Sequence, residues 1–242
     1  MSSSCSSAAV GVGALFGSHS SGKALARASA LGTFVSSEQV AVQRGLAEFR
    51  GGRPVLFSAR EPFVAMPIDG CDQQLLEAFQ QTFNTAPLRL AITARRASAL
   101  GIKTRGPVTL HLDEEAGVSE IFSLAASSSV TRPPDASPAR PTVLAGIDLA
   151  KLAGRLPAVL IADAGSAIPC ALVQLEATAV SMFREQLIRS MSIAASSVIP
   201  LEGMDAAQFF VFRNAIGSGL AAIVIGEPNC RAPSLCAYIQ PA

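Results

Sequence analysis

Two glycines and a lysine near the amino terminus have almost the spacing of a phosphate-binding loop. In GSHSSGKA, Gly17, Gly22 and Lys23 match the pattern GxxxxGK followed by Ser or Thr, in which backbone N–H groups and the lysine hold phosphates. Ala24, however, stands where a hydroxyl should bind Mg²⁺. Asp163 ends the apolar run PAVLIAD, which resembles a second nucleotide-binding motif. However, any buried strand that enters a loop can show this pattern. We therefore expect no phosphate site.

Residues that act as bases or metal ligands are few and scattered. His19 lies in a Ser-rich tail, and His111 lies in TLHLD, where the flanking leucines take the inward face of an alternating strand. The acidic group Asp113–Glu115 at the end of that stretch is interpreted as a solvated turn. The cysteines form no CxxC pair and have no nearby histidine, so we expect free thiols in a reducing compartment: Cys5, Cys71, Cys170, Cys230 and Cys236. The residues alone assign no catalytic, cofactor-binding or metal-ligating position.

Composition narrows the class of protein. The chain has 242 residues, half of them apolar, which is enough for one large domain or slightly more. Nineteen basic and eighteen acidic residues give no excess of positive charge, and no basic cluster suggests a nucleic-acid partner. No apolar run approaches the roughly 20 residues that span a bilayer. We therefore expect a soluble, cytoplasmic protein with no membrane or nucleic-acid partner.

The amino-terminal segment differs in composition from the rest. The first acidic residue is Glu38, and the preceding stretch is rich in Ser, Ala and Gly. Such a composition rarely supports packing, so residues 1–36 are predicted to be a disordered tail. Alternatively, the start codon was assigned wrongly and these residues are not part of the protein. The absence of acidic residues also leaves an organellar transit peptide open.

From Glu38 onward, helix and strand patterns alternate. Helices are predicted over 38–52, 71–83, 94–101, 147–154 and 175–192, and strands over 53–59, 63–68, 88–93, 107–113, 157–163, 208–214 and 220–226. The Ser- and Pro-rich residues 127–141 are predicted to be a loop, and AIGSG between the last two strands indicates a hairpin. This order of elements predicts an α+β domain with a mixed sheet in three layers.

Three of these helices have a clear inward face. The expected core positions are Val42, Gly45, Leu46 and Phe49 in the first, Leu75, Leu76, Phe79 and Phe83 in the second, and Ala179, Met182, Phe183, Leu187 and Met191 in the last. The methionines of the last helix are thus predicted to pack in the core and not to line a ligand site.

Several segments resemble a known enzyme family in the same order. LAEFRGGRPVLF resembles the opening of 3,4-dihydroxy-2-butanone 4-phosphate synthase, and LRLAITARRASALG, VTLHLDEEAGVSEIFS and IDLAKLAGRLPAVLIA continue the resemblance over about residues 38–195. The catalytic motifs are missing. Where the family has the acidic loop RENEGD, this chain has SAREPFVAMP, with Arg60 and Glu61 as the only remnants, and where it has GHTE, this chain has RPTVLAG. Without an acidic cluster for magnesium and without the histidine, the resemblance implies a degenerate, inactive domain.

Such a degenerate domain resembles the amino-terminal half of a subgroup of GTP cyclohydrolase II proteins, where it precedes the zinc-dependent domain. Residues 198–228 are similar to that junction and to the first cyclohydrolase hairpin, with expected core positions at Phe210, Phe212, Ile223 and Ile225. In that family, three later cysteines hold a zinc ion with an open position for water. The resemblance therefore implies zinc for the intact family member and no cofactor in this chain.

The ending PSLCAYIQPA stands where the family has a segment close to APVPVRLHSACLTGD. Read in a shifted frame from Pro233, every codon is compatible with VPVRLHSACL. We hypothesise that a frameshift, real or from sequencing, truncates a GTP cyclohydrolase II, in which case Cys236 and Tyr238 have no function. The strand over 220–226 should then expose an unpaired apolar edge. An intact gene that cannot encode VRLHSAC in any frame would contradict the hypothesis.

The sequence thus predicts four parts: a tail over 1–36, a degenerate synthase-like domain over 37–197, an opening cyclohydrolase hairpin over 198–230 and an out-of-frame tail over 231–242. The resemblance implies a riboflavin-biosynthesis protein, inactive as it stands, that forms a homodimer and binds GTP only with the missing domain. Two alternatives stay open: a standalone structural or regulatory dimerisation module, and a divergent synthase that acts on ribulose 5-phosphate.

Overall fold

The computed structural model describes residues 36–83, 87–113, 115–127, 134–165, 171–200, 207–216 and 219–225, and the backbone of 237–239. The chain divides into two units, Met1–Ser37 and Glu38–Ala242. The near-match to a phosphate loop, His19 and residues 1–35 of the predicted tail therefore lie outside the described residues, as do all cysteines except Cys71. Among the described residues, no helix is long and apolar enough to cross a membrane.

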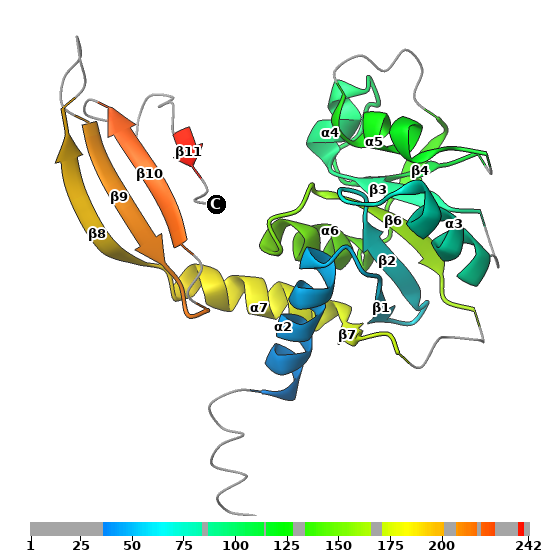
Figure 1. Ribbon diagram of the computed structural model, residues 1–242, viewed down its shortest axis with the longest axis horizontal. Helices are drawn as coiled ribbons and strands as arrows, with labels where there is room; N and C mark the ends of the chain where they lie inside the picture. Colours follow the sequence, from blue (N-terminus) through cyan, green and yellow to red (C-terminus); the bar gives the residue numbers. More distant parts are fainter. Residues whose placement is uncertain are drawn as a thin grey trace, which may run out of the picture. The chain divides into compact units, whose positions relative to one another are not determined.

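Most of the larger unit is built around one mixed sheet (Figure 1). Its strands lie in the order β5-β4-β3-β6-β2-β1-β7, and all neighbours are antiparallel except β1 and β7. The strands are β1 (Val55–Ser58), β2 (Phe63–Pro67), β3 (Arg89–Ile92), β4 (Val108–His111), β5 (Ala136–Pro138), β6 (Ala158–Asp163) and β7 (Gln174–Glu176). The helices are α2 (Ser37–Arg50), α3 (Gln73–Thr82), α4 (Ala94–Ala99), α5 (Val118–Ala126), α6 (Val143–Leu152) and α7 (Ala177–Arg189).

Helices cover both faces of this sheet and form two separate cores. Because successive strand residues point to opposite faces, Leu90 and Leu160 pack with α3, α4 and α5, whereas Ala91 and Ile161 pack with α2, α6 and α7. The predicted α+β class with a mixed sheet in three layers is confirmed.

Local signals mark the ends of α2, α3 and α4 close to the predicted positions, whereas α6 begins at Val143, before its predicted start at Ile147. Asp72 caps α3, since its Oδ1 accepts a hydrogen bond from the Leu75 N–H at 2.7 Å. Thr93 caps α4, since its Oγ1 accepts a hydrogen bond from the Arg96 N–H at 3.2 Å. Gly52 and Gly101 follow α2 and α4 with φ of 72° and 80°, a conformation that favours glycine at a helix end.

The core predicted for the last helix is partly wrong. Val42, Gly45, Leu46 and Phe49 are buried in α2 as expected, but in α7 the Met182 side chain is 63% exposed. Met182 lies about 100° around the helix from the buried Phe183, so it falls beside the inward stripe that includes Val180 and Leu187. Met191 is also exposed, because α7 ends at Arg189.

The predicted loop over 127–141 contains a strand. Within it, β5 pairs with β4 in the register Thr109 with Ser137, and the hydroxyl oxygens of these two residues lie 2.9 Å apart. A three-residue strand that ends in proline is tolerated here because β5 lies at the edge of the sheet. The Ser- and Pro-rich composition therefore concealed a short edge strand.

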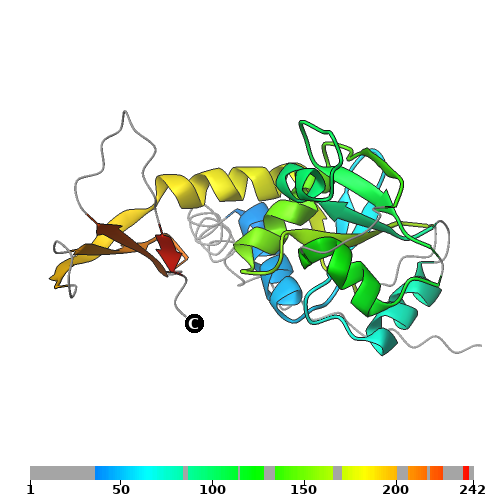
Figure 2. The same cartoon turned by 90° about the horizontal axis from the view of Figure 1, so that it is seen from above.

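A second sheet has the order β11-β10-β9-β8 and is fully antiparallel (Figures 1 and 2). Its strands are β8 (Ser192–Ile199), β9 (Ala207–Arg213), β10 (Gly219–Ile225) and β11 (Ala237–Ile239). The predicted hairpin is confirmed by the pairing of β9 with β10, whereas β8 was not predicted, and the boundary expected between residues 197 and 198 falls inside it. That division into domains stays a prediction.

The second sheet differs from expectation in two further respects. Phe210, Phe212 and Ile223 are only half-buried and Ile225 is exposed, so the predicted core positions do not form a closed core among the described residues. The edge predicted to be unpaired, that of β10, is paired with β11, so that prediction is wrong.

Candidate functional site

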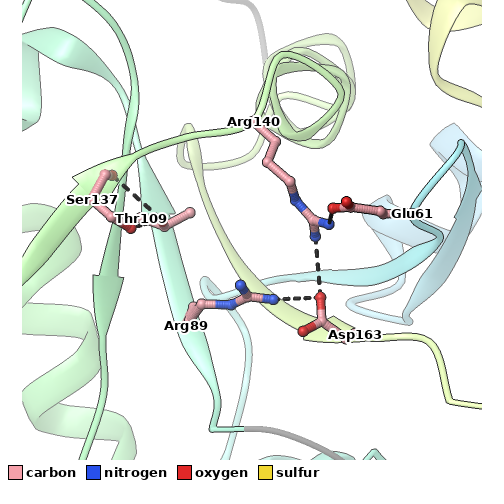
Figure 3. Close-up of polar contacts among 6 residues, drawn as sticks. All are labelled: Glu61, Arg89, Thr109, Ser137, Arg140 and Asp163. Carbon is pink, nitrogen blue, oxygen red and sulfur yellow. Dashed lines mark hydrogen bonds and ion pairs between the residues drawn. The ribbon is translucent and has the colours of Figure 1, made fainter.

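Four charged side chains from distant parts of the chain meet at one edge of the seven-stranded sheet (Figure 3). We call Glu61, Arg89, Arg140 and Asp163 the sheet-edge cluster. Asp163 is the last residue of β6 and Arg89 the first of β3, and these strands are antiparallel neighbours, so both side chains start at the same edge. Glu61 lies between β1 and β2, and Arg140 lies between β5 and α6.

Strand alternation aims Arg89 and Asp163 at the same face. Arg89 is two residues from Ala91 and Asp163 two residues from Ile161, and both apolar residues belong to the core beneath α6. Phe63 pairs with Asp163 in the register of β2 and β6 and also belongs to that core. The sheet-edge cluster therefore forms the polar rim of the core that α2, α6 and α7 cover.

Asp163 lies between two guanidinium groups. Arg89 Nη2 donates to its Oδ1 at 2.5 Å, and Arg140 Nη2 donates to the same oxygen at 3.1 Å. The other amino group of Arg140, Nη1, donates to Glu61 Oε2. The carbon at the centre of the same guanidinium lies 6.0 Å from the centroid of the Phe63 ring, within the range of a cation–π contact. Arg140 thus joins the turn before β2 to the end of β6.

This pairing decides what the cluster can do chemically. Two carboxylates and two guanidinium groups sum to zero charge, and arginine stays protonated throughout the physiological range. Each carboxylate is already bonded to a permanent cation, so a divalent cation at this place would compete with the guanidinium groups for the carboxylate oxygens.

The other residues singled out in the sequence do not join this cluster. His111 is exposed at the end of β4, as predicted from the leucines that flank it. Asp113 and Glu115 are exposed, and Glu114 lies outside the described residues. Within the described ranges, no group of three or more His, Cys, Asp or Glu side chains is arranged to hold a metal ion.

The sequence pointed to Glu61 and Asp163 but missed Arg89 and Arg140. Arg89 lies near the start of a predicted strand, and Arg140 lies near the end of a predicted loop. Their common partner, Asp163, is 74 residues from Arg89 and 23 residues from Arg140, and nothing in the local sequence pattern indicates this contact. The one available signal is a charged residue at the first position of an otherwise apolar strand, RLAI, which is favourable only if an opposite charge lies at the same sheet edge.

Cys71 is the one cysteine among the described residues, and it is half-buried. Burial, together with the charge of the adjacent Asp72, raises the pKa of its thiol to about 11. In a variant whose other four cysteines are replaced by serine, we expect iodoacetamide to modify Cys71 slowly at pH 7.5, with a rate that rises about tenfold per pH unit because the thiolate is the nucleophile. Mass spectrometry of timed samples measures the rate. A rate equal to that of a free thiol peptide at pH 7.5 would contradict the raised pKa.

Comparison with known proteins adds a relationship by sequence. No family model matches the chain. GTP cyclohydrolase-2 from Azospirillum brasilense is 29% identical over 217 residues, which cover 81% of this chain and 56% of that protein. The chain therefore spans little more than half the length of this relative.

Solved structures give only a distant similarity. A two-domain 3,4-dihydroxy-2-butanone 4-phosphate synthase from A. baumannii has a TM-score of 0.46 at 17% identity, over 77% of this chain and 70% of that chain. A cation-free 3,4-dihydroxy-2-butanone 4-phosphate synthase has a TM-score of 0.47 at 15% identity, over 60% of this chain and 96% of that chain. In sequence, the chain is similar to GTP cyclohydrolase-2 from Azospirillum brasilense, in agreement with the resemblance of its own segments.

Proposed function

We propose that this chain is the non-catalytic amino-terminal part of a riboflavin-biosynthesis protein of the GTP cyclohydrolase II type. It acts as a folded module and catalyses neither the synthase nor the cyclohydrolase reaction. The observation that carries the proposal is the state of the sheet-edge cluster, in which both carboxylates, Glu61 and Asp163, are bonded to guanidinium groups.

The two segments in which the synthase motifs are missing are the segments that meet in this cluster. SAREPF contributes Glu61, and RPTVLAG contributes Arg140, whose guanidinium bonds to Glu61. An acidic site for magnesium needs carboxylates that are free to share a cation, and general acid or base catalysis needs a group that titrates near the working pH. An arginine supplies neither, because it carries a fixed positive charge. The absence of the acidic loop and of the histidine, together with the arginine present in this cluster, supports loss of catalysis with retention of the fold.

The proposal predicts that the purified chain releases no formate from either substrate of the two related reactions. The chain is incubated with ribulose 5-phosphate and Mg²⁺, and separately with GTP and Zn²⁺, and formate is measured with a coupled dehydrogenase. An active synthase and an active GTP cyclohydrolase II serve as positive controls in the same buffers. Formate above the rate without protein would contradict the proposal, and the substrate that yields it would identify which activity is present.

The wider properties expected of the intact family member are part of the same proposal. Zinc and GTP would be bound by the portion of the relative that this chain does not match. A homodimer and a cytoplasmic location are proposed for the chain itself. The alternative of a standalone structural or regulatory module also predicts that no formate is released. It differs from the main proposal because this chain, without any further domain, must then carry the surface that binds a partner.

A further inference from the structure

The outer strand of the second sheet, β8, lacks the charged residues and prolines that commonly protect a sheet edge. It pairs with β9 on one side, and no other described strand lies on its opposite side, which Figure 1 shows as the outer side of the sheet. All eight residues, Ser192–Ile199, are exposed, and the strand SIAASSVI contains no charge and no proline. Natural edge strands usually carry lysine, proline or an inward charge, because open backbone N–H and C=O groups accept a further strand.

On the opposite side of the same sheet, the edge of β10 is already paired with a further strand. There β10 pairs with β11 in the register Ala221 with Ile239, Ala222 with Tyr238 and Ile223 with Ala237. The longest open edge among the described strands of this sheet is therefore that of β8. Its exposed side chains include Ile193 and Val198, 59% and 63% exposed, which are large apolar residues that lose water contact if another strand is added.

The symmetry of β8 points to a second copy of the same strand as its partner. Its register with β9 is interrupted between Ile193 and Ala195, so Ala194 is the extra residue of a bulge. After this bulge, Ile193, Ser196 and Val198 face the side of Phe210 and Phe212, while Ser192, Ala195, Ser197 and Ile199 face the other side.

A two-fold axis at Ser196 makes these two sets of side chains match. In an antiparallel pair of β8 strands about that axis, with the bulge residue Ala194 left out of the register as it is in the pairing with β9, Ile193 lies opposite Val198 twice, Ala195 opposite Ser197, and Ser196 opposite its own copy. Residues that lie opposite each other then always share a face, as antiparallel pairing requires. Because the strand is uncharged, the symmetric pair brings no like charges together.

We infer that two copies of this chain associate through antiparallel pairing of their β8 strands, with the two-fold axis at Ser196. The contact is isologous, so it closes as a dimer and leaves no repeated edge for further growth. This interface is independent of the catalytic state of the sheet-edge cluster and of the activity of the longer relatives.

Cysteine cross-linking tests the register directly. Ser196→Cys is introduced into the full chain after its five native cysteines are replaced by serine. Opposite residues of an antiparallel pair have Cα atoms about 4.5–5.5 Å apart, within disulfide range. We expect Ser196→Cys to form a covalent dimer on mild oxidation and with a short bismaleimide, which does not depend on disulfide geometry.

Two matched variants serve as controls. Val198→Cys is also at an exposed position, but in this register it lies four strand positions, about 13 Å, from its own copy, so it should form little disulfide. Ser119→Cys on the exposed face of α5 should cross-link with neither reagent. Equal capture of Ser196→Cys and Ser119→Cys would overturn the proposal, and preferential disulfide formation by Val198→Cys would overturn the register.

Charge variants test the same contact without cross-linking. Light scattering over a dilution series should show a dimer for the unmodified chain. The dissociation constant of this dimer should rise about fivefold or more for Ser196→Lys and for Ser196→Glu, because like charges then face each other. An equal mixture of the two variants should restore the dimer, while Ser119→Lys should leave it unchanged. Circular dichroism confirms that each variant is folded. A monomer at all concentrations, or a dimer unaffected by Ser196→Lys, would contradict the inference.

Discussion

Replacing Phe63 with alanine is expected to lower the free energy of unfolding by about 3–5 kcal/mol. The Phe63 side chain is fully buried, and its ring lies nearly parallel to that of Phe57, with centroids 4.9 Å apart. A Cβ atom added at Gly146 of α6 would lie 3.9 Å from the Phe63 ring, so the helix packs directly against it. The shortened side chain would leave a cavity between β2 and α6 that neither element can fill without moving.

Phe122→Ala provides the matched control for this prediction. Phe122 lies on α5 and is 43% exposed, so the same chemical change removes fewer packing contacts and should cost less than about 1 kcal/mol. Urea unfolding followed by circular dichroism gives both values on the same scale. Comparable losses for the two variants would show that the core between β2 and α6 is not packed as described.

Phe63 also supports the sheet-edge cluster from below. Its ring lies under the Arg140 guanidinium, and its backbone is paired with that of Asp163. We therefore expect the effect of Phe63→Ala to be non-additive with changes at Arg140, because contacting residues share their interaction energy. This coupling links the apolar core to the cluster on which the proposed function rests.

Periodicity in the sequence predicted most elements of the large domain because their inner faces are strongly apolar, whereas α5, β5 and β7 were not predicted. The runs PAVLIAD and LRLAIT became β6 and β3, which lie side by side in the middle of the sheet and are buried on both faces. The same approach failed for SIAASSVI, since β8 buries neither face and has no alternation to detect. Here strand formation depends on pairing with β9, which a local pattern does not contain.

The candidate site was less predictable than the fold. Asp163 could be singled out as the end of an apolar segment and Glu61 from the family resemblance, but their partners depend on the order β3-β6-β2 of the sheet and on where the segment before α6 runs. That order brings residues 61, 89, 140 and 163 to one place although no two are close in sequence. A charge at a segment end is informative only once the neighbouring strand is known.

Asp163→Ala is expected to destabilise the chain, because it leaves Arg89 and Arg140 without their shared acceptor. The Arg89 side chain is only 22% exposed, and its Nε already has no hydrogen-bond partner, so the loss of the carboxylate leaves a largely buried cation with less compensation. Asp163 itself is 41% exposed, and solvent screening keeps the expected loss near about 1–2 kcal/mol. Urea unfolding measures the difference.

An exposed ion pair on α7 gives the control for the loss of a carboxylate. Glu185 and Arg189 lie 3.6 Å apart and are both largely exposed, so Glu185→Ala should change stability by less than about 0.5 kcal/mol. The double variant Asp163→Leu with Arg89→Leu should lose less than the sum of the two single changes, since it removes both partners of one partly buried pair.

The sign of the Asp163→Ala effect also tests the proposed loss of catalysis. In active sites, catalytic groups are held in unfavourable surroundings, and their removal commonly stabilises the fold. In the sheet-edge cluster, by contrast, each carboxylate is already neutralised by arginine, so removing Asp163 should only weaken the fold. A gain in stability on Asp163→Ala would therefore mean that the cluster keeps the strain of a working site, and it would contradict a purely structural role even if no formate were detected.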